Sequence, residues 1–146
     1  MSWKVFAEEA SELAALGLEK LNRKICYLAL LDETGAPRIH PITPFIGGGI
    51  LFMFTEPTSP KIRDLQRDGR YAIHCAVGRD GPLIEYLVTG EAELITDPAQ
   101  RAQAAQIASS PVVTDTYALF EFHVADVLAV TYDEEKKKVV GRWHSD

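Results

Sequence analysis

The chain has 146 residues, 47% of them hydrophobic and 25% charged, which is typical of one globular domain with a real core and excludes a disordered chain. Its net charge of −6 argues against broad contact with a nucleic-acid backbone, whereas a small anionic ligand needs only two or three cations. Cys26 and Cys75 lie far apart in apolar runs, so we expect buried thiols and neither a disulfide framework nor a metal site.

No targeting or membrane segment is evident. The first residues lack the basic start and apolar run of a signal peptide, and no apolar stretch reaches the length of a membrane span. We therefore expect a cytoplasmic protein with no membrane partner. Without an internal repeat or linker, residues 1–146 are expected to form a single domain.

The spacing of apolar residues divides the chain into helices and strands. In chain order, the predicted elements are a helix over 3–16 that ends near Gly17, strands over 24–31, 38–42 and 50–55, a helix over 60–67, strands over 71–77 and 83–95, a helix over 99–108 capped by Asp97-Pro98, and strands over 118–124, 127–132 and 138–143. About seven or eight short strands in hairpin order favour an antiparallel barrel over a parallel α/β sheet.

Three local signals refine this outline. Pro41 cannot donate to a strand ladder, so its strand is expected at an edge or to be irregular. The glycines at 47–49 predict a turn, because a phosphate-binding glycine loop needs a following helix and lysine that are missing here. Gly90, inside a long predicted strand, indicates a bulge or a barrel corner.

The most informative segment is the strand-to-helix junction at residues 51–65. Ser59 is suited to cap the helix, and Pro60 to its first turn. Lys61 opposes the helix macrodipole there, so helix stability alone favours an acidic residue. A bound phosphate would reverse that preference, and with Thr55 nearby the junction predicts an anion site.

The order and spacing of several motifs resemble those of the pyridoxamine-phosphate-oxidase-like family of flavin-binding split barrels. The motifs are Arg38-Ile-His-Pro-Ile42, then Thr55-x3-Ser59-x-Lys61 with Leu65, then Val88-Thr-Gly90-Glu-Ala-Glu-Leu94, and the resemblance runs from about Lys24 to Glu121. It implies a mostly β, α+β fold: an antiparallel split β-barrel with flanking helices. It also implies a homodimer that binds FMN at the subunit interface.

The resemblance assigns most of the expected cofactor-binding residues. Arg38, Thr55, Ser59 and Lys61 would hold the FMN phosphate and ribityl chain, with Phe54 beside them. Ile39, His40, Pro41, Ile42 and Thr43 would run along the flavin ring and offer backbone groups to its pyrimidine edge. A dianionic phosphate favours such charged and hydroxyl donors. The alternative is that Arg38 and Lys61 are solvated surface charges.

Three further positions have two interpretations each. His40 either contacts the flavin or a substrate, or is simply a packed side chain. Glu85, where related vitamin B6 oxidases usually have a glutamine, either alters a ring contact or faces solvent. Trp143 either stacks on the partner's flavin or closes the end of the barrel.

The resemblance limits what can be said about a reaction. The Arg-x-His pair that meets the substrate phosphate in B6 oxidases is missing from residues 125–132, so pyridoxamine phosphate is not the expected substrate. We expect an FMN-dependent oxidoreductase that uses a reduced nicotinamide and an unidentified small molecule, with no metal. The alternatives are a deazaflavin- or haem-binding relative, a non-catalytic flavin-storage or stress-response protein, and an interaction module without cofactor.

Overall fold

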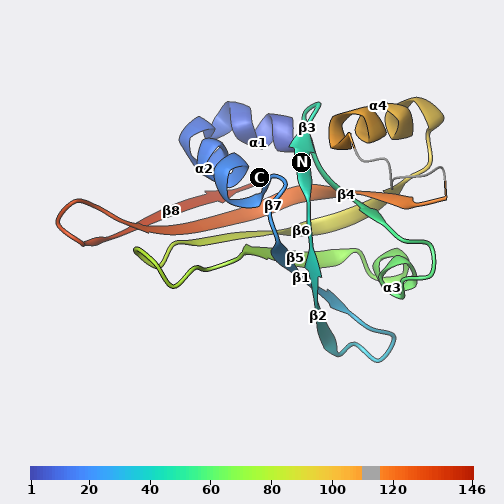
Figure 1. Cartoon of the computed structure of the whole chain (residues 1–146), viewed down its shortest axis with the longest axis horizontal. Helices are drawn as coiled ribbons and strands as arrows, with labels where there is room; N and C mark the ends of the chain where they lie inside the picture. The colour runs from blue at the N-terminus through green and yellow to red at the C-terminus, as the bar shows by residue number, and fades with distance from the viewer. Residues whose placement is uncertain (110–115) are drawn as a thin grey trace.

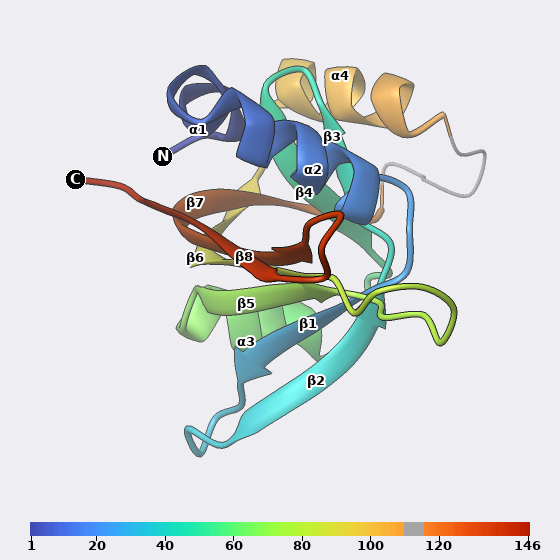
Figure 2. The ribbon, with the colours of Figure 1, turned by 90° about the vertical axis from the view of Figure 1, so that its left-hand side faces the viewer.

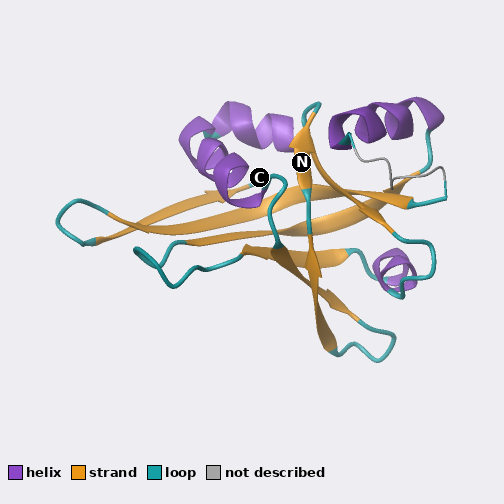
Figure 3. Cartoon of the chain, viewed as in Figure 1, coloured by secondary structure: helices purple, strands orange, loops and turns teal. Residues whose placement is uncertain are grey.

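A computed structural model describes residues 1–109 and 116–146 (Figures 1 and 3). Its elements are α1 (Trp3–Glu9), α2 (Ser11–Leu21), β1 (Cys26–Leu31), β2 (Pro37–Ile42), β3 (Phe45–Gly47), β4 (Ile50–Thr55), α3 (Lys61–Arg67), β5 (Arg70–Cys75), β6 (Glu85–Ile95), α4 (Pro98–Ala108), β7 (Ala118–Tyr132) and β8 (Lys138–His144). The expected mostly β architecture is confirmed, as is the position of nearly every predicted element.

The strands form one open antiparallel sheet. Its eight strands follow the order β2-β1-β5-β6-β7-β4-β3, and β8 pairs with β7 beyond this path. The two ends of the path, β2 and β3, are consecutive in the chain and separated only by Thr43 and Pro44. In Figure 1 the chain runs almost straight from one to the other across the remaining strands. The barrel is therefore split between β2 and β3, and the prediction of an edge strand at Pro41 is confirmed.

The helices cover the sheet unequally. In both Figure 1 and Figure 2, α1, α2 and α4 lie on one side of the long strands and α3 lies on the other. The main core contains Trp3 and Phe6 of α1 together with barrel side chains such as Tyr86 and Phe122. A separate small core under α4 joins Ala104 and Ala108 to buried residues of β4, β6 and β7.

The start of the chain differs from the prediction. One helix ending near Gly17 is wrong: two helices meet at Ala10, whose φ of −140° breaks the first, and α2 continues to Leu21. Gly17 lies inside α2 and does not end it. Its lack of a side chain instead leaves room for Tyr86. A Cβ there would lie 2.4 Å from the hydroxyl oxygen of Tyr86, which donates a hydrogen bond to the Leu13 carbonyl.

The later strands also differ in detail from those predicted from the sequence. Residues 118–132 form the single strand β7 instead of two, since its first half pairs with β4 and its second half with β8. The bulge predicted at Gly90 is confirmed by a register shift between Thr89 and Gly90 in the β6–β7 ladder. Asp97 caps α4, as predicted, by accepting a hydrogen bond from the Gln100 amide at 2.9 Å. The three-residue strand β3 was not predicted.

Cys26 and Cys75 are free, buried thiols, as expected, and they face each other across β1 and β5. Burial raises the pKa of both, that of Cys26 to about 12, so neither thiol is reactive at neutral pH. In the described residues no cluster of His, Cys, Asp and Glu has the arrangement of a metal site. None of the helices found there is long and apolar enough to cross a bilayer.

Candidate functional site

A cleft of about 530 Å³ lies at the split in the barrel. One wall is the end of β2 and the two residues after it. The other is the end of β4 and the turn that leads into α3. The lining residues are Pro41, Ile42, Thr43, Met53, Phe54, Thr55, Glu56, Thr58, Ser59, Pro60, Lys61 and Tyr117. The strand-to-helix junction singled out in the sequence therefore forms one side of the cleft.

The junction begins α3 one residue later than predicted. Pro60 precedes the helix with φ −64° and ψ −17°, and Lys61 is its first residue. Pro60 takes the N-cap position expected for Ser59, but the hydroxyl oxygen of Ser59 still accepts a hydrogen bond from the Lys61 amide at 3.3 Å. With only seven residues, α3 has a weak dipole, so the polar side chains must provide most of the attraction for an anion.

Two cations near the cleft have acidic groups nearby but no close ion pair in the described chain. Across residues 1–109 and 116–146, neither Lys61 nor Arg38 forms an ion pair. Partial burial lowers the pKa of Lys61, against the opposing effect of the nearby Glu56 carboxylate. A partly desolvated ammonium without a close ion-pair partner is a group that a bound anion would stabilise.

Three buried polar atoms around the cleft lack a hydrogen-bond partner within the described chain: Thr55 Oγ1, His40 Nε2 and Asp64 Oδ2. Thr55 is 3% exposed and lines the cleft directly. Because buried polar groups are nearly always hydrogen-bonded, such orphaned atoms beside a cavity indicate a missing partner. The hydroxyl of Thr55 and the ammonium of Lys61 together fit an oxyanion.

His40 belongs to the same basic environment. Burial lowers its pKa, and the charges of Lys61 and Arg38 lower it further, while the Asp64 carboxylate acts in the opposite direction. The imidazole is therefore expected to be neutral at pH 7. Asp64, which the sequence did not single out, is buried in α3, and its Oδ1 accepts a hydrogen bond from Arg67 at 3.1 Å.

The structure brings together most, but not all, of the predicted site residues. Those that line the cleft are Pro41, Ile42, Thr43, Phe54, Thr55, Ser59 and Lys61. Arg38 and His40 lie close enough for their charges to interact, without lining the cleft. Ile39 lies between Arg38 and His40 in β2, so its side chain points to the opposite face of the strand from theirs, and it is 70% exposed. Glu85 begins β6 opposite Val130, outside the cleft of its own chain.

Trp143 also lies outside this cleft. Its ring packs on Phe6 of α1 with a centroid distance of 4.9 Å, and its indole N–H donates to Glu9 at 3.1 Å. Within the chain, these contacts match the interpretation in which Trp143 closes the end of the barrel.

Several lining residues had no individual signal in the sequence. Tyr117 enters from just before β7, and its carbonyl accepts a hydrogen bond from the Arg101 guanidinium at 2.6 Å. Glu56 and Thr58 belong to the predicted junction and are hydrogen-bonded to each other. Glu56 places a negative charge in the same cleft as Lys61.

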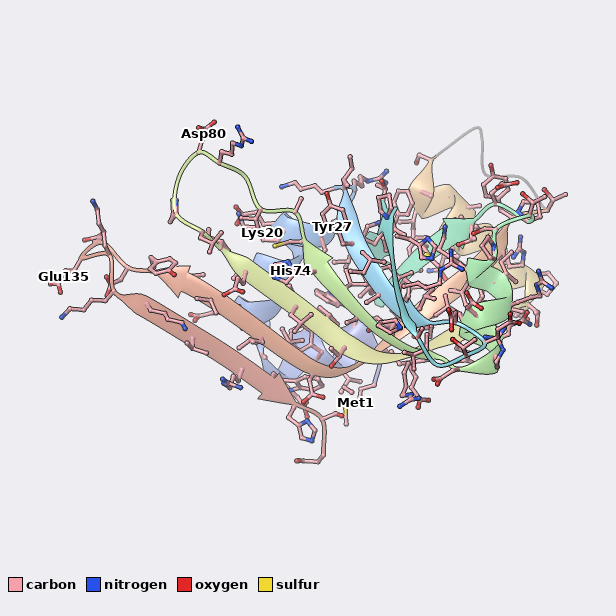
Figure 4. All side chains as sticks on the ribbon, turned by 90° about the horizontal axis from the view of Figure 1, so that it is seen from below. Met1, Lys20, Tyr27, His74, Asp80 and Glu135 are labelled. Carbon is pink, nitrogen blue, oxygen red and sulfur yellow. The ribbon has the colours of Figure 1, made fainter. Side chains whose placement is uncertain are left out.

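A second surface of interest is the outer face of the sheet. Strand register places one row of side chains across six strands on this face: Pro41, Tyr27, His74, Leu87, Leu128 and Arg142. The next row contains Ile39, Ala29, Ala72, Thr89, Asp126 and His144. Tyr27 is 46% exposed, and Figure 4 labels it with His74 on the neighbouring strand. We call these two rows the outer face.

Comparisons with known proteins bear on the family and the fold of the chain. The family model described as pyridoxamine 5'-phosphate oxidase matches residues 12–131, which is most of the chain. No curated protein matches.

Solved structures share the fold at low sequence identity. A NimC/NimA family protein from Clostridium acetobutylicum is 16% identical, with a TM-score of 0.69 and 96% of both chains covered. PhzG from Burkholderia lata, in complex with tetrahydrophenazine-1-carboxylic acid, is 14% identical, with a TM-score of 0.65 over 99% of this chain and 88% of PhzG. A heme binding protein from Mycobacterium smegmatis is 20% identical, with a TM-score of 0.65 over 92% of this chain but only 57% of that one.

Proposed function

The chain belongs to the pyridoxamine 5'-phosphate oxidase family, and on that premise we propose that its cleft binds FMN. Thr55, Ser59, Lys61 and Arg38 would hold the phosphate and ribityl chain. The observation that carries this proposal is that one cleft holds a buried hydroxyl without a hydrogen-bond partner in the described chain, on Thr55, and the partly buried ammonium of Lys61, which forms no close ion pair there. Both groups would gain a partner from a phosphate, which accepts charge-assisted hydrogen bonds.

The edge of β2 would position the flavin ring. Its outward-facing backbone groups pair with no strand in the described chain, so those groups of residues 39–42 that do not join the β1 ladder, with only a carbonyl at Pro41, are free to meet the polar edge of a ring. Bound FMN would supply hydride-transfer chemistry, and the chain would bind and orient it and limit the access of water. We expect the protein to act as an oxidoreductase that takes electrons from a reduced nicotinamide. We expect it to do so in the cytoplasm.

The spectrum of the purified protein tests this proposal. We expect a yellow protein, or one that quenches the fluorescence of added FMN, and mass spectrometry of the denatured sample should identify FMN. A Soret band would instead assign haem, and a released deazaflavin would assign that cofactor. A colourless protein that leaves FMN fluorescence unchanged would contradict the proposal.

A homodimer would complete the cofactor site. The outer face exposes Ile39 and Tyr27 on strands β2 and β1, beside the cleft wall at Pro41. A second copy of the chain would cover these apolar side chains and bring its own residues to the neighbouring cleft. Glu85 and Trp143 would reach a flavin only through such a partner.

Ile39→Glu should break this dimer. Placing a charge at a covered apolar contact is expected to weaken association by about 2 kcal/mol or more, roughly 30-fold. Analytical ultracentrifugation over a concentration series measures the change. Leu18→Glu is the matched control, because Leu18 is 48% exposed on α2, away from the outer face. A dimer that survives Ile39→Glu but dissociates with Leu18→Glu would place the interface on the helical side.

A further inference from the structure

A second cavity lies under α4, away from the flavin cleft. It has a volume of about 150 Å³ and is enclosed by α4 on one side and by β3, β4, β6 and β7 on the other. The lining residues are Gly47, Gly48, Ile50, Ile95, Gln100, Gln103, Ala104, Ile107, Leu119 and Glu121. None of these residues lines the cleft at the barrel split.

The packing of α4 explains why this space exists. Ile107 contacts the β3–β4 turn so closely that a Cβ on Gly47 would lie 2.7 Å from it. Toward the centre of the helix, the small side chain of Ala104 faces the sheet without filling the gap. Comparable apolar cavities of about 150 Å³ are large enough to hold benzene, so this one has room for about six heavy atoms.

One wall of the cavity carries a carboxylate. The side chain of Glu121 is only 13% exposed, and its Oε2 lies 3.3 Å from His123 Nδ1. Strand register places a second carboxylate, Glu93, directly opposite Glu121, and the other nitrogen of His123 contacts Glu93 at 2.7 Å. Two carboxylates that face each other across a strand ladder repel each other. The imidazole of His123 contacts both of them.

We propose that this cavity binds a small organic cation, a primary ammonium on a short apolar chain. The ammonium would lie against Glu121 and donate further hydrogen bonds to the side-chain carbonyl oxygens of Gln100 and Gln103. The apolar chain would contact Ile50, Ile107 and Leu119. A neutral or anionic ligand fits less well, because the carboxylate pair makes this end of the cavity negative.

The ionisation of Glu121 agrees with this assignment. Burial is the main cause that raises the pKa of its carboxyl group, and the Glu93 charge raises it further, against the opposing effects of His123 and of the N-terminal ammonium. A cation placed beside the carboxylate would lower that pKa again, so the ligand would stabilise the charged form.

Titration with n-pentylammonium and its neutral analogue 1-pentanol tests the proposal, with 15N-labelled full-length protein observed by NMR. We expect amide shifts concentrated in α4 and β7, and binding of the amine about tenfold or more tighter than that of the alcohol. Glu121→Gln should remove this preference, while Glu93→Gln, whose side chain is 61% exposed, should retain most of it. Ala104→Leu should fill the cavity and abolish binding of both probes.

Several results would overturn the proposal. They are no saturable binding of the amine, equal affinity for both probes in the unmodified protein, or a preference for the amine over the alcohol that survives in Glu121→Gln. If Ala104→Leu does not fold, the amide shifts of the unmodified protein show where the probe binds. Shifts confined to residues 37–61 would place the probe in the flavin cleft and contradict the proposal. Binding of FMN should be unchanged in Glu121→Gln, so this test and the FMN proposal can fail separately.

Discussion

Lys61→Ala should weaken FMN binding by about 1.5–3 kcal/mol, roughly 10- to 150-fold in Kd, because it removes a hydrogen bond to a charged group. Arg38→Ala should have an effect of the same size. Quenching of FMN fluorescence by the apoprotein measures both. The stability of the apoprotein should not fall in Lys61→Ala, since a lysine in the first turn of α3 opposes the helix dipole.

Glu56→Gln is the matched control for Lys61→Ala. It removes a charge of the opposite sign from the same cleft, so FMN should bind more tightly than to the unmodified protein. If both cation variants keep their affinity, the phosphate lies elsewhere. If Glu56→Gln weakens binding as much as Lys61→Ala does, the loss reflects a disturbed junction and not a lost charge.

Gly90→Ala should destabilise the fold by about 4 kcal/mol or more, the range reached when a side chain has no space in a rigid site. A Cβ at this position would lie 2.0 Å from the carbonyl oxygen of His123 and 3.1 Å from the Ala125 amide nitrogen. These are backbone atoms of β7 at the bulge, so they cannot move aside as a flexible side chain would. Thermal and urea unfolding measure the loss.

Gly78→Ala is the control for Gly90→Ala. A Cβ on Gly78 would have no neighbour within 4 Å, so the free energy of unfolding of this variant should change by less than about 0.5 kcal/mol. If Gly90→Ala unfolds at the same midpoint as Gly78→Ala, the close approach at the bulge is not a real constraint on the sheet.

The sequence predicted the features that depend on neighbouring residues. The edge position of Pro41, the bulge at Gly90 and the cap at Asp97 each follow from what one residue type allows the backbone to do. Features set by distant contacts were missed. Gly17 resembles a helix terminator in sequence, and only the position of Tyr86 shows that it is a packing contact.

The candidate site was predictable to the same extent. Thr55, Ser59 and Lys61 lie within one junction, so their spacing alone places them in one wall of the cleft. Tyr117 joins them from a segment more than fifty residues later, and the β4–β7 pairing that brings it there leaves no local pattern. The cavity at Glu121 likewise depends on where α4 rests on the sheet.

The split between β2 and β3 also has a consequence for the dynamics of the molecule. No ladder joins these two edges in the described chain, and β2 is held to the sheet by β1 alone. Apart from core contacts of side chains such as Leu28, the β1–β2 hairpin is therefore joined to the sheet by one ladder, β1–β5, so the amides of the edge strand β2 should exchange hydrogen earlier than those of the central strands. A ligand that contacts both walls of the cleft would hold β2 and β4 together. Its binding free energy would then add directly to the free energy needed to open the β1–β2 hairpin.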